Sequence, residues 1–544
     1  MAARMPTPLL TARAGISLFD ALGDHGLESP GFSQATIDAV SAALTQFHTQ
    51  IVRYRIPDNN VSVIATEAMR RASNSAQMIE AISNATDGLR VHILDPPVET
   101  LLGAVMGSRS SLINVDGGAL FLDLGGGSVQ MTWVDTSLQN YEIEAARAGQ
   151  SLPFGAARMH RIMTEMHVDG QTAETTKLTD GLRDAFEVLC ARFPRLGEIR
   201  DAYKGGDQDA RIHVYMCGGG FRGYGSMLMH DDPIQPYPIP SVNSYAVDAA
   251  RFKQTDRMRQ INSDHEGKIF GLSSRRRRQF PSITAVVDAF ISAVPNIGIV
   301  TFCGGSNREG VMMMRLPRVI RENNPLEYIC RVIPQEMPVF DVLRAQMTSA
   351  LPEEFNFDRI PTIFNSGLFL LFAREMSARR GYSADANASF ALRNTVVRST
   401  DGPGFTHLTR ALLALALFAR SGGALAPADV ELYKNLRRVA DVHGFGVSFW
   451  ALYTGAIAYV METINVNIPG GPSLDILRTS VRFRAHIVKG EEGKKDTVDL
   501  LIRLSPQVIR GIDLDELAYN VKSAAKSAGE KSYPFKIDVR VQVS

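Results

Sequence analysis

The composition of the chain is that of a soluble globular protein. It has 544 residues, of which 45% are hydrophobic and 21% are charged, and this length predicts about three or four domains. The net charge of +1 provides no overall field that would recruit nucleic acid or an anionic membrane. The four cysteines lie far apart without a C-x-x-C pair, which argues against a zinc site or a disulfide framework and indicates a reducing compartment.

The first part of the chain alternates helix and strand patterns. Residues 33–54 carry apolar side chains that recur on one helical face. Two short apolar runs, residues 61–66 and 89–94, predict strands, and residues 67–82 and 98–108 predict helices. This alternation predicts an α/β domain with a largely parallel sheet.

A glycine-rich stretch follows, FLDLGGGSVQ at residues 121–130. Three consecutive glycines weaken a strand, because glycine loses more backbone entropy on folding than any other residue. Two interpretations account for them. One is a loop whose backbone N–H groups approach an anion, which a Cβ would block; the other is a bare turn between the two strands of a hairpin. These ten residues alone leave both open.

Glycine clusters also follow two later strand patterns, at residues 218–220 and 304–305. Three clusters, each at a strand end, predict loops that converge on one phosphorylated ligand. Residues 218–223 also match the G-x-G-x-x-G pattern of dinucleotide-binding folds. The proline-broken segment 230–242 stands where such a fold needs a second strand and an acidic residue, which argues against that fold.

The densest basic run is SSRRRRQ, with arginine at residues 275–278. Such a run can contact a phosphate tail, serve as a nuclear import patch or lie in a solvated loop. We favour the solvated loop.

The pattern changes after residue 325. Residues 404–423 and 427–464 predict helices with apolar faces, and the apolar run 449–461 is too short to span a bilayer and predicts a buried helix. Two strands around a charged turn, a helix and a final strand then predict a ββαβ tail. This part carries no catalytic constellation, which favours a partner-binding or dimerisation module.

Six motifs resemble those of one protein family, and they occur in the family's order. They are RAGISL at 13–18, ATEAMRRASN at 65–74, DLGGGSVQ at 123–130, LPFGAAR at 152–158, CGGGFRG at 217–223 and CGGSNREG at 303–310. Over roughly residues 10–325 the chain resembles the exopolyphosphatase/guanosine pentaphosphate phosphatase family. Within that family it is most similar to fungal retrograde regulation proteins, which carry mitochondrial signals to the nucleus.

The resemblance implies an actin-like fold, in which two α/β lobes close on a ligand, followed by an α+β domain. The implied first lobe, residues 1–115, lacks the leading strands and the first phosphate loop of the family. The implied second lobe covers residues 116–325 and carries the glycine loops. The C-terminal domain covers residues 326–544, with helices followed by the ββαβ tail.

The resemblance also implies roles for single residues. Asp123 would hold Mg²⁺ through water, because Mg²⁺ keeps most of its hydration shell. Glu99 would activate the attacking water, although an acid in the first turn of a helix is also favoured by the helix dipole alone. Gln130 stands where the family has glutamate; it can bind water or a hydrated metal but cannot act as a base. The residues expected to bind phosphate or nucleotide are Arg70, Gly125, Gly126, Gly127, Ser128, Gly218, Gly219, Gly220, Gly304 and Gly305.

We therefore expect a regulator that binds ATP or polyphosphate with Mg²⁺ and acts in mitochondrial retrograde signalling with weak or no hydrolysis. Gln130 and the missing first loop should reduce turnover more than binding. The alternatives are an active exopolyphosphatase or nucleotide phosphatase, and a pure protein scaffold. The expected partners are regulatory proteins of a retrograde pathway, with a homodimer left open and with no membrane or nucleic acid. The expected location is the cytoplasm, with the nucleus as a second compartment.

Overall fold

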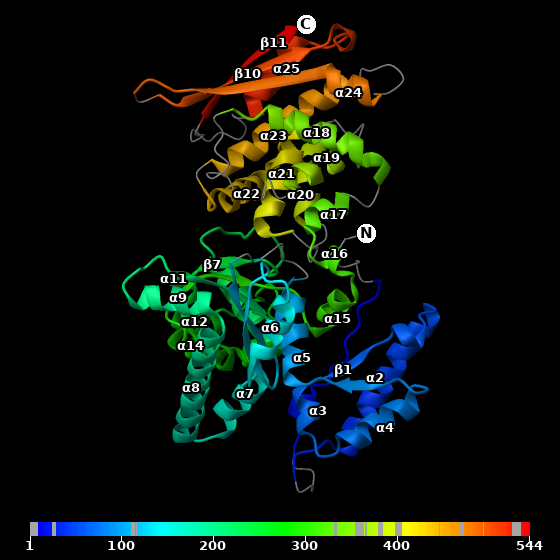
Figure 1. Cartoon of the computed structure of the whole chain (residues 1–544), viewed down its shortest axis with the longest axis vertical. Helices are drawn as coiled ribbons and strands as arrows, with labels where there is room; N and C mark the ends of the chain where they lie inside the picture. The colour runs from blue at the N-terminus through cyan, green and yellow to red at the C-terminus, as the bar shows by residue number, and fades with distance from the viewer. Residues whose placement is uncertain are drawn as a thin grey trace. The chain divides into compact units, whose positions relative to one another are not determined.

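The computed structural model describes residues 9–23, 29–109, 115, 117–330, 334–353, 364, 367–378, 385–397, 405–444, 446–466, 473–492, 494–524 and 535–544. They form two compact units (Figure 1). We call the described residues of Thr7–Asp231 and Val242–Pro317 the body, and those of Asp232–Ser241 and Arg318–Ser544 the C-terminal unit. The predicted division of residues 1–325 into two lobes falls almost wholly inside the body and stays a prediction.

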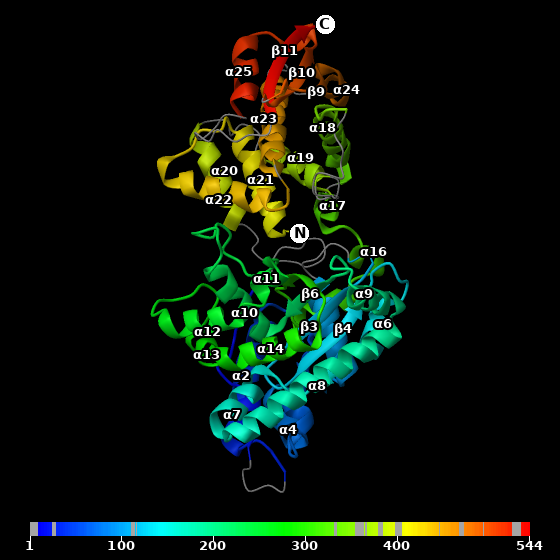
Figure 2. The same ribbon diagram turned by 90° about the vertical axis from the view of Figure 1, so that its left-hand side faces the viewer.

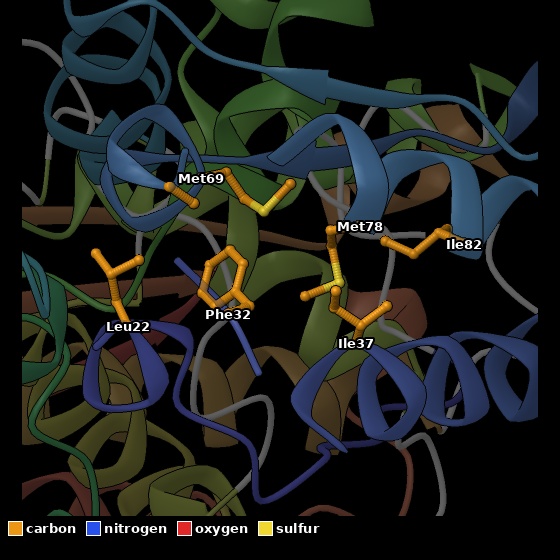
Figure 3. Close-up of a cluster of buried hydrophobic side chains, with 7 residues drawn as sticks. Leu22, Phe32, Ile37, Met69, Met78 and Ile82 are labelled. Atoms are coloured by element: carbon orange, nitrogen blue, oxygen red, sulfur yellow. The ribbon is translucent and has the colours of Figure 1, made fainter. Parts of the chain in front are cut away.

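The N-terminal part of the body packs helices against a small sheet. Strands β1 and β2 pair in parallel, with Val63 opposite Val91. Figure 3 shows the core beneath them, where apolar side chains from α2, α3 and α4 meet those of the chain around Leu22 and Phe32. The elements are α1 (Leu18–Ala21), α2 (Gln34–Arg53), β1 (Val63–Ala65), α3 (Glu67–Arg71), α4 (Ser75–Ala85) and β2 (Val91–Ile93).

The single helix predicted over residues 67–82 is wrong, because the chain forms two helices, α3 and α4, with a break at residues 72–74. Asn74 explains the break. Its Oδ1 accepts a hydrogen bond from the Phe32 N–H at 2.8 Å, and its Nδ2 donates to the Phe32 carbonyl at 2.9 Å. The side chain of Asn74 thus pairs with a distant backbone segment, and helical periodicity cannot reveal such a contact.

A second sheet of six strands forms the centre of the body, in the order β5-β4-β3-β6-β8-β7. Figure 2 shows β6, β3 and β4 side by side in this sheet. Strands β3, β6 and β8 are parallel, so their carboxyl ends, and the glycine clusters that follow them, lie at one edge of the sheet. Strands β3 and β4 form the predicted hairpin, with Asp123 opposite Gln130. The strands are β3 (Ala119–Leu124), β4 (Val129–Val134), β5 (Gln150–Leu152), β6 (Ile212–Cys217), β7 (Ala246–Asp248) and β8 (Ile297–Phe302).

Helices cover both faces of this sheet, since every residue of β3 and β4 is buried. The basic run at residues 275–278 lies in the short helix α13, so the solvated loop that we favoured is wrong. The helices are α5 (Pro96–Thr100), α6 (Tyr141–Ala148), α7 (Ala156–Glu165), α8 (Val168–Arg192), α9 (Pro194–Lys204), α10 (Gly218–His230), α11 (Ala249–Phe252), α12 (Thr255–Asp264), α13 (Ser274–Arg278), α14 (Phe280–Ala293) and α15 (Asn307–Arg315).

A π-helix, η2 (Leu101–Gly107), continues α5 towards the sheet edge. Its backbone lies directly against α15. A Cβ at Gly107 would come within 2.8 Å of the Ser306 carbonyl oxygen, and one at Gly310 would clash with the carbonyl of Leu102. Glycine is therefore needed on both sides of this contact. π-Helical turns often occur at functional sites.

The C-terminal unit consists of helices followed by a three-stranded sheet, in which β10 is antiparallel to β9 and parallel to β11. Helix α23 is long and apolar enough to cross a membrane by length and composition, yet 83% of its apolar stretch is buried inside the unit, as expected for a core helix. The elements are α16 (Arg318–Arg321), α17 (Pro325–Cys330), α18 (Met337–Ser349), α19 (Leu368–Ala378), α20 (Asp385–Val397), α21 (His407–Arg420), α22 (Val430–Asp441), α23 (Val447–Val466), α24 (Leu474–Ser480), β9 (Val481–Val488), β10 (Asp496–Leu504), α25 (Leu514–Ala524) and β11 (Phe535–Val543).

Residues Asp232–Ser241 belong to the C-terminal unit although they follow α10 of the body in sequence. Two hydrogen bonds anchor this segment. Asn435 donates from Nδ2 to the Pro236 carbonyl at 2.9 Å, and the Tyr237 hydroxyl lies 2.7 Å from His407 Nδ1. Helix α10 is thus joined covalently to a segment that is fixed in the C-terminal unit.

Candidate phosphate-binding site

The loop between β3 and β4 carries backbone N–H groups that make no hydrogen bond within the described part of the chain. A hydrogen bond of 3.0 Å from Gly125 N–H to the Ser128 carbonyl closes the loop. The first two N–H groups of α7 donate to the carbonyls of Gly125 and Gly126, each at 2.9 Å. Among the described residues, the N–H groups of Gly126, Gly127 and Ser128 donate no hydrogen bond. A loop that engages the carbonyls of Gly125, Gly126 and Ser128 and leaves three amides unbonded is suited to an anion.

Packing explains only one of the three glycines in this loop. A Cβ at Gly127 would come within 2.7 Å of the Phe19 ring, so this position has no room for a side chain. A Cβ at Gly126 would meet no atom closer than 4.0 Å, and one at Gly125 none closer than 3.5 Å. Neither residue has a positive φ. The fold alone would accept a side chain at both positions, which is the expected pattern where a ligand must approach the backbone.

Asp123 lies at the end of β3, beside this loop, with only 8% of its surface exposed. Burial raises its pKa from 3.8 to about 6; the nearby charge of Arg222 opposes the shift and that of Glu99 adds to it. Its Oδ2 and the Asn307 Oδ1 both face the Cα of Gly103 in η2, at 2.5 and 2.8 Å from where a Cβ would stand. Gly103 therefore leaves the space in which these two oxygens meet.

Three oxygen-bearing groups at this edge of the sheet fit a hydrated Mg²⁺. Besides the carboxylate of Asp123, they are Gln130 Oε1, directly across the hairpin, and Asn307 Oδ1. Both amide oxygens are buried without a hydrogen-bond partner among the described residues. A buried oxygen of this kind is costly unless it is bonded, and Mg²⁺ or its water supplies such a bond. The described residues contain no cluster of three or more His, Cys, Asp or Glu side chains suited to a metal, so most ligands of the ion would be water or ligand oxygens.

Glu99 and Arg70 form an ion pair near this site. Nη2 of Arg70 lies 2.6 Å from Glu99 Oε2 and 2.9 Å from Glu67 Oε2, and Nη1 donates to the Leu94 carbonyl. Burial raises the pKa of Glu99, because one guanidinium nitrogen is shared between two carboxylates and does not offset the full loss of hydration. A buried carboxylate with a raised pKa suits a general base. In this structure, however, Arg70 binds Glu99.

The later glycine clusters lie at the same edge of the sheet but are packed more tightly. Gly218, Gly219 and Gly220 form the first turn of α10 rather than a loop, and Gly218 has a φ of +82° that closes the turn against Asp123. The other cluster is also enclosed by protein. Gly304 donates its N–H to Asn243 at 2.8 Å, and a Cβ at Gly305 would clash with the backbone of η2. Packing accounts for these glycines, so the roles predicted for them stay predictions.

Two residues that the sequence did not single out complete the site. Asn307 begins α15 shortly after the third glycine cluster. Because asparagine is common at helix starts, its position in the sequence did not indicate a ligand-binding role. Arg222 lies in α10, and its Nη1 donates to the carbonyls of Cys303, Gly304 and Gly305 at 3.4, 3.3 and 3.0 Å. This arginine ties the second glycine cluster to the third.

The body is thus a mixed α/β fold in which the glycine loop and a buried acid share one edge of the sheet. The model of the Ppx/GppA phosphatase family matches residues 2–319, and the chain belongs to this family. The model of the RTG2 C-terminal domain matches residues 325–544. The predicted family and fold class are therefore confirmed.

The chain is also similar to individual proteins. It is 29% identical to retrograde regulation protein 2 of Saccharomyces cerevisiae over 513 residues. The matched region covers 92% of this chain and 82% of the yeast protein. An exopolyphosphatase structure from Cytophaga hutchinsonii is 18% identical to this chain, with a TM-score of 0.39. The match covers 54% of this chain and 88% of the exopolyphosphatase chain. The type II variant of the Aquifex aeolicus Ppx/GppA phosphatase is 14% identical to this chain, with a TM-score of 0.38. The match covers 54% of this chain and 86% of the Aquifex aeolicus chain.

Proposed function

We propose that the chain is a regulatory member of this family, which binds ATP or polyphosphate with Mg²⁺ and hydrolyses it slowly or not at all. The observation that supports it best is the loop of residues 125–128, with three unbonded N–H groups beside a buried acid. The similarity to retrograde regulation protein 2 favours a role in mitochondrial retrograde signalling.

Binding can be tested at Gly126. A valine at this position should fold normally, because its Cβ meets no atom closer than 4.0 Å, but its side chain would occupy the space above the loop amides. We expect Gly126→Val to weaken binding of ATP and polyphosphate with Mg²⁺ at least about 100-fold, since it removes several charge-assisted hydrogen bonds. Isothermal titration calorimetry measures the affinity, and an unchanged unfolding midpoint confirms the fold. Equal affinity of the variant and the wild type would refute phosphate binding at this loop.

The same variant tests whether binding becomes a signal. Helix α10 begins with the glycine turn beside Asp123 and leads into residues Asp232–Ser241 of the C-terminal unit. A ligand that binds one state of this connection better shifts the equilibrium by its differential affinity, and about 3 kcal/mol is roughly a 150-fold shift. We propose that the ligand alters the binding of a retrograde-pathway partner to the C-terminal unit in the cytoplasm. Equal partner capture by the wild type and Gly126→Val, with and without nucleotide, would instead favour the scaffold alternative.

An active phosphatase is the second candidate, because Glu99 is buried with a raised pKa close to the loop. Gln130 argues against it: its Nε2 donates to the Ser128 hydroxyl at 2.7 Å, and an amide at this position brings no negative charge. We expect phosphate release from ATP or polyphosphate to be far below the roughly 1–10³ per second of ordinary enzymes. A release assay on the purified chain measures this. Several turnovers per second that Glu99→Gln abolishes, while Glu67→Gln retains them, would restore the enzyme alternative.

A further inference from the structure

The three-stranded sheet of the C-terminal unit has one buried face and one exposed face. Its inner face is formed by alternate residues of β10 whose side chains are fully buried, namely Val498, Leu500, Ile502 and Leu504. Successive side chains of a strand point to opposite faces, so the intervening residues of β10 and their neighbours in β9 and β11 form the outer face. The outer side chains of β11 are all exposed.

Arginines gather at one end of this outer face. Arg503 of β10 stands directly opposite Arg482 of β9 in the antiparallel ladder. Two residues earlier in β10, Leu501 stands between Arg484 of β9 and Arg540 of β11. The four arginines are exposed, and Leu501 is half-buried. We call Arg482, Arg484, Arg503 and Arg540 the arginine face.

The arginine face contains a repulsion that the fold does not offset. Two of its members have acidic partners, since Arg540 lies 2.6 Å from Asp499 and Arg484 lies 3.1 Å from Glu353. The side chains of Arg482 and Arg503 make no ion pair or hydrogen bond among the described residues. Like charges directly opposite each other destabilise a pair of strands. This pair therefore contributes nothing to the sheet, which is the pattern expected where charge serves binding.

The chemistry of the outer face favours an acidic protein segment over a nucleic acid. A guanidinium group binds a carboxylate through two parallel hydrogen bonds, and Leu501 offers an apolar contact between two such groups. Single-stranded nucleic acid needs aromatic side chains for base stacking, and the outer face of the described strands carries no Phe, Tyr or Trp. Asp499 and Asp538, which stand opposite each other on the same face, would also repel a phosphate backbone.

We propose that the arginine face binds an acidic segment of a partner protein. Carboxylates of the segment pair with Arg482 and Arg503 and remove their repulsion, while an apolar side chain covers Leu501. This inference goes beyond the proposed function, because it holds whether or not the loop of residues 125–128 binds a ligand.

The test compares two double variants of the full chain that each remove two positive charges. Arg482→Gln with Arg503→Gln changes the arginine face, and Lys489→Gln with Lys495→Gln changes exposed residues of the turn between β9 and β10. The probe is a short fluorescent peptide of glutamates around one leucine, and fluorescence anisotropy measures its binding. We expect the arginine variant to weaken binding about tenfold and the lysine variant to change it less than about twofold, because only the arginines contact the peptide. Added salt should weaken wild-type binding, as it does for exposed charges.

Further measurements decide between this contact and its alternatives. Removing two repelled cations should leave the unfolding midpoint of the arginine variant unchanged or raise it; a lower midpoint with lost binding would mean that the arginines act through the fold, and would overturn the proposal. So would an equal loss in both double variants, no peptide binding by the wild type, or tighter binding of a single-stranded RNA or of polyphosphate at the arginine face. Gly126→Val should bind the peptide as the wild type does, so failure of the proposed nucleotide binding and failure of this inference give different results.

Discussion

Replacing Asp123 by asparagine should stabilise the ligand-free body and at the same time abolish Mg²⁺-dependent ligand binding. Asp123 is 8% exposed, and the pKa of its carboxyl group is raised from 3.8 to about 6. At pH 7.5 the folded chain therefore carries a buried charge that the unfolded chain would hydrate. The rise from 3.8 to about 6 corresponds to a cost of about 3 kcal/mol for keeping this carboxylate charged in the folded state. Asparagine has no charge to bury, so Asp123→Asn should raise the free energy of unfolding by about 2–3 kcal/mol.

The pH dependence has a definite sign. Between pH 3.8 and about 6 the folded state binds this proton more tightly than the unfolded state, so the wild type loses stability as the pH rises through that range. The variant has no such proton. The stability difference between the two proteins should therefore be close to zero below pH 4 and reach its full size above pH 6.

The chain offers a reporter and a control for this measurement. Trp133 lies in β4 of the body, and the other tryptophan, Trp450, lies in the C-terminal unit, so a Trp450→Phe background lets fluorescence follow the body alone. Asp135 is also 8% exposed, but it accepts hydrogen bonds from the N–H and hydroxyl of Ser137 at 3.0 and 2.6 Å. Asp135→Asn should therefore destabilise the body, by about 1–2 kcal/mol. If Asp123→Asn destabilises it by the same amount, Asp123 is a structural acid and its metal role loses its support.

Local pattern was sufficient for the elements whose contacts are near in sequence. The periodicity of residues 33–54 predicted α2, and the hairpin of β3 and β4 follows from two apolar runs around a glycine turn. Parallel strands that each end in glycine also led to the expectation that the clusters lie together, and β3, β6 and β8 do end at one sheet edge.

The sequence could not show features that depend on distant partners. The break between α3 and α4 comes from a contact between Asn74 and Phe32, 42 residues apart. The π-helix η2 packs its backbone on α15, about 200 residues further along the chain, and nothing in its own residues shows this. The sequence presents Arg276 as one member of a basic run and so predicted a solvated side chain. Its contact with Gly219 depends on the packing of α13 on α10, which the run itself does not show.

The candidate site divides in the same way. The motif order singled out Asp123, the loop of residues 125–128, Arg70 and Glu99, and their predicted roles stay predictions. It did not show that Arg70 and Glu99 pair with each other, as they do in the structure. It could not distinguish glycines that face open space from glycines that face protein. Only the built structure separates Gly126, with its open surroundings, from Gly305, which is enclosed by η2.

Replacing Arg70 by methionine should produce the largest loss of stability among these variants. Its side chain is 17% exposed, and its guanidinium lies between Glu99 and Glu67, whose side chains are 8% and 19% exposed. Methionine keeps much of the volume but leaves two partly buried carboxylates close together without a cation. Removing one partner of a buried ion pair costs about 3–5 kcal/mol, and the partial exposure here favours the lower end, about 3 kcal/mol.

The neighbouring arginine provides the control, and a second substitution tests the cause. Arg71 is exposed, and within the described residues its guanidinium approaches the Phe19 ring, at 5.9 Å, and makes no ion pair. Arg71→Met should therefore change the free energy of unfolding by less than about 1 kcal/mol. If repulsion between the two acids causes the loss, adding Glu67→Gln to Arg70→Met should recover part of it, because a single carboxylate can then become protonated. Denaturant unfolding of the four proteins measures both effects. A loss that Glu67→Gln does not reduce would mean that Arg70 acts through packing and its bond to the Leu94 carbonyl, and the charge of Glu99 would then not depend on Arg70.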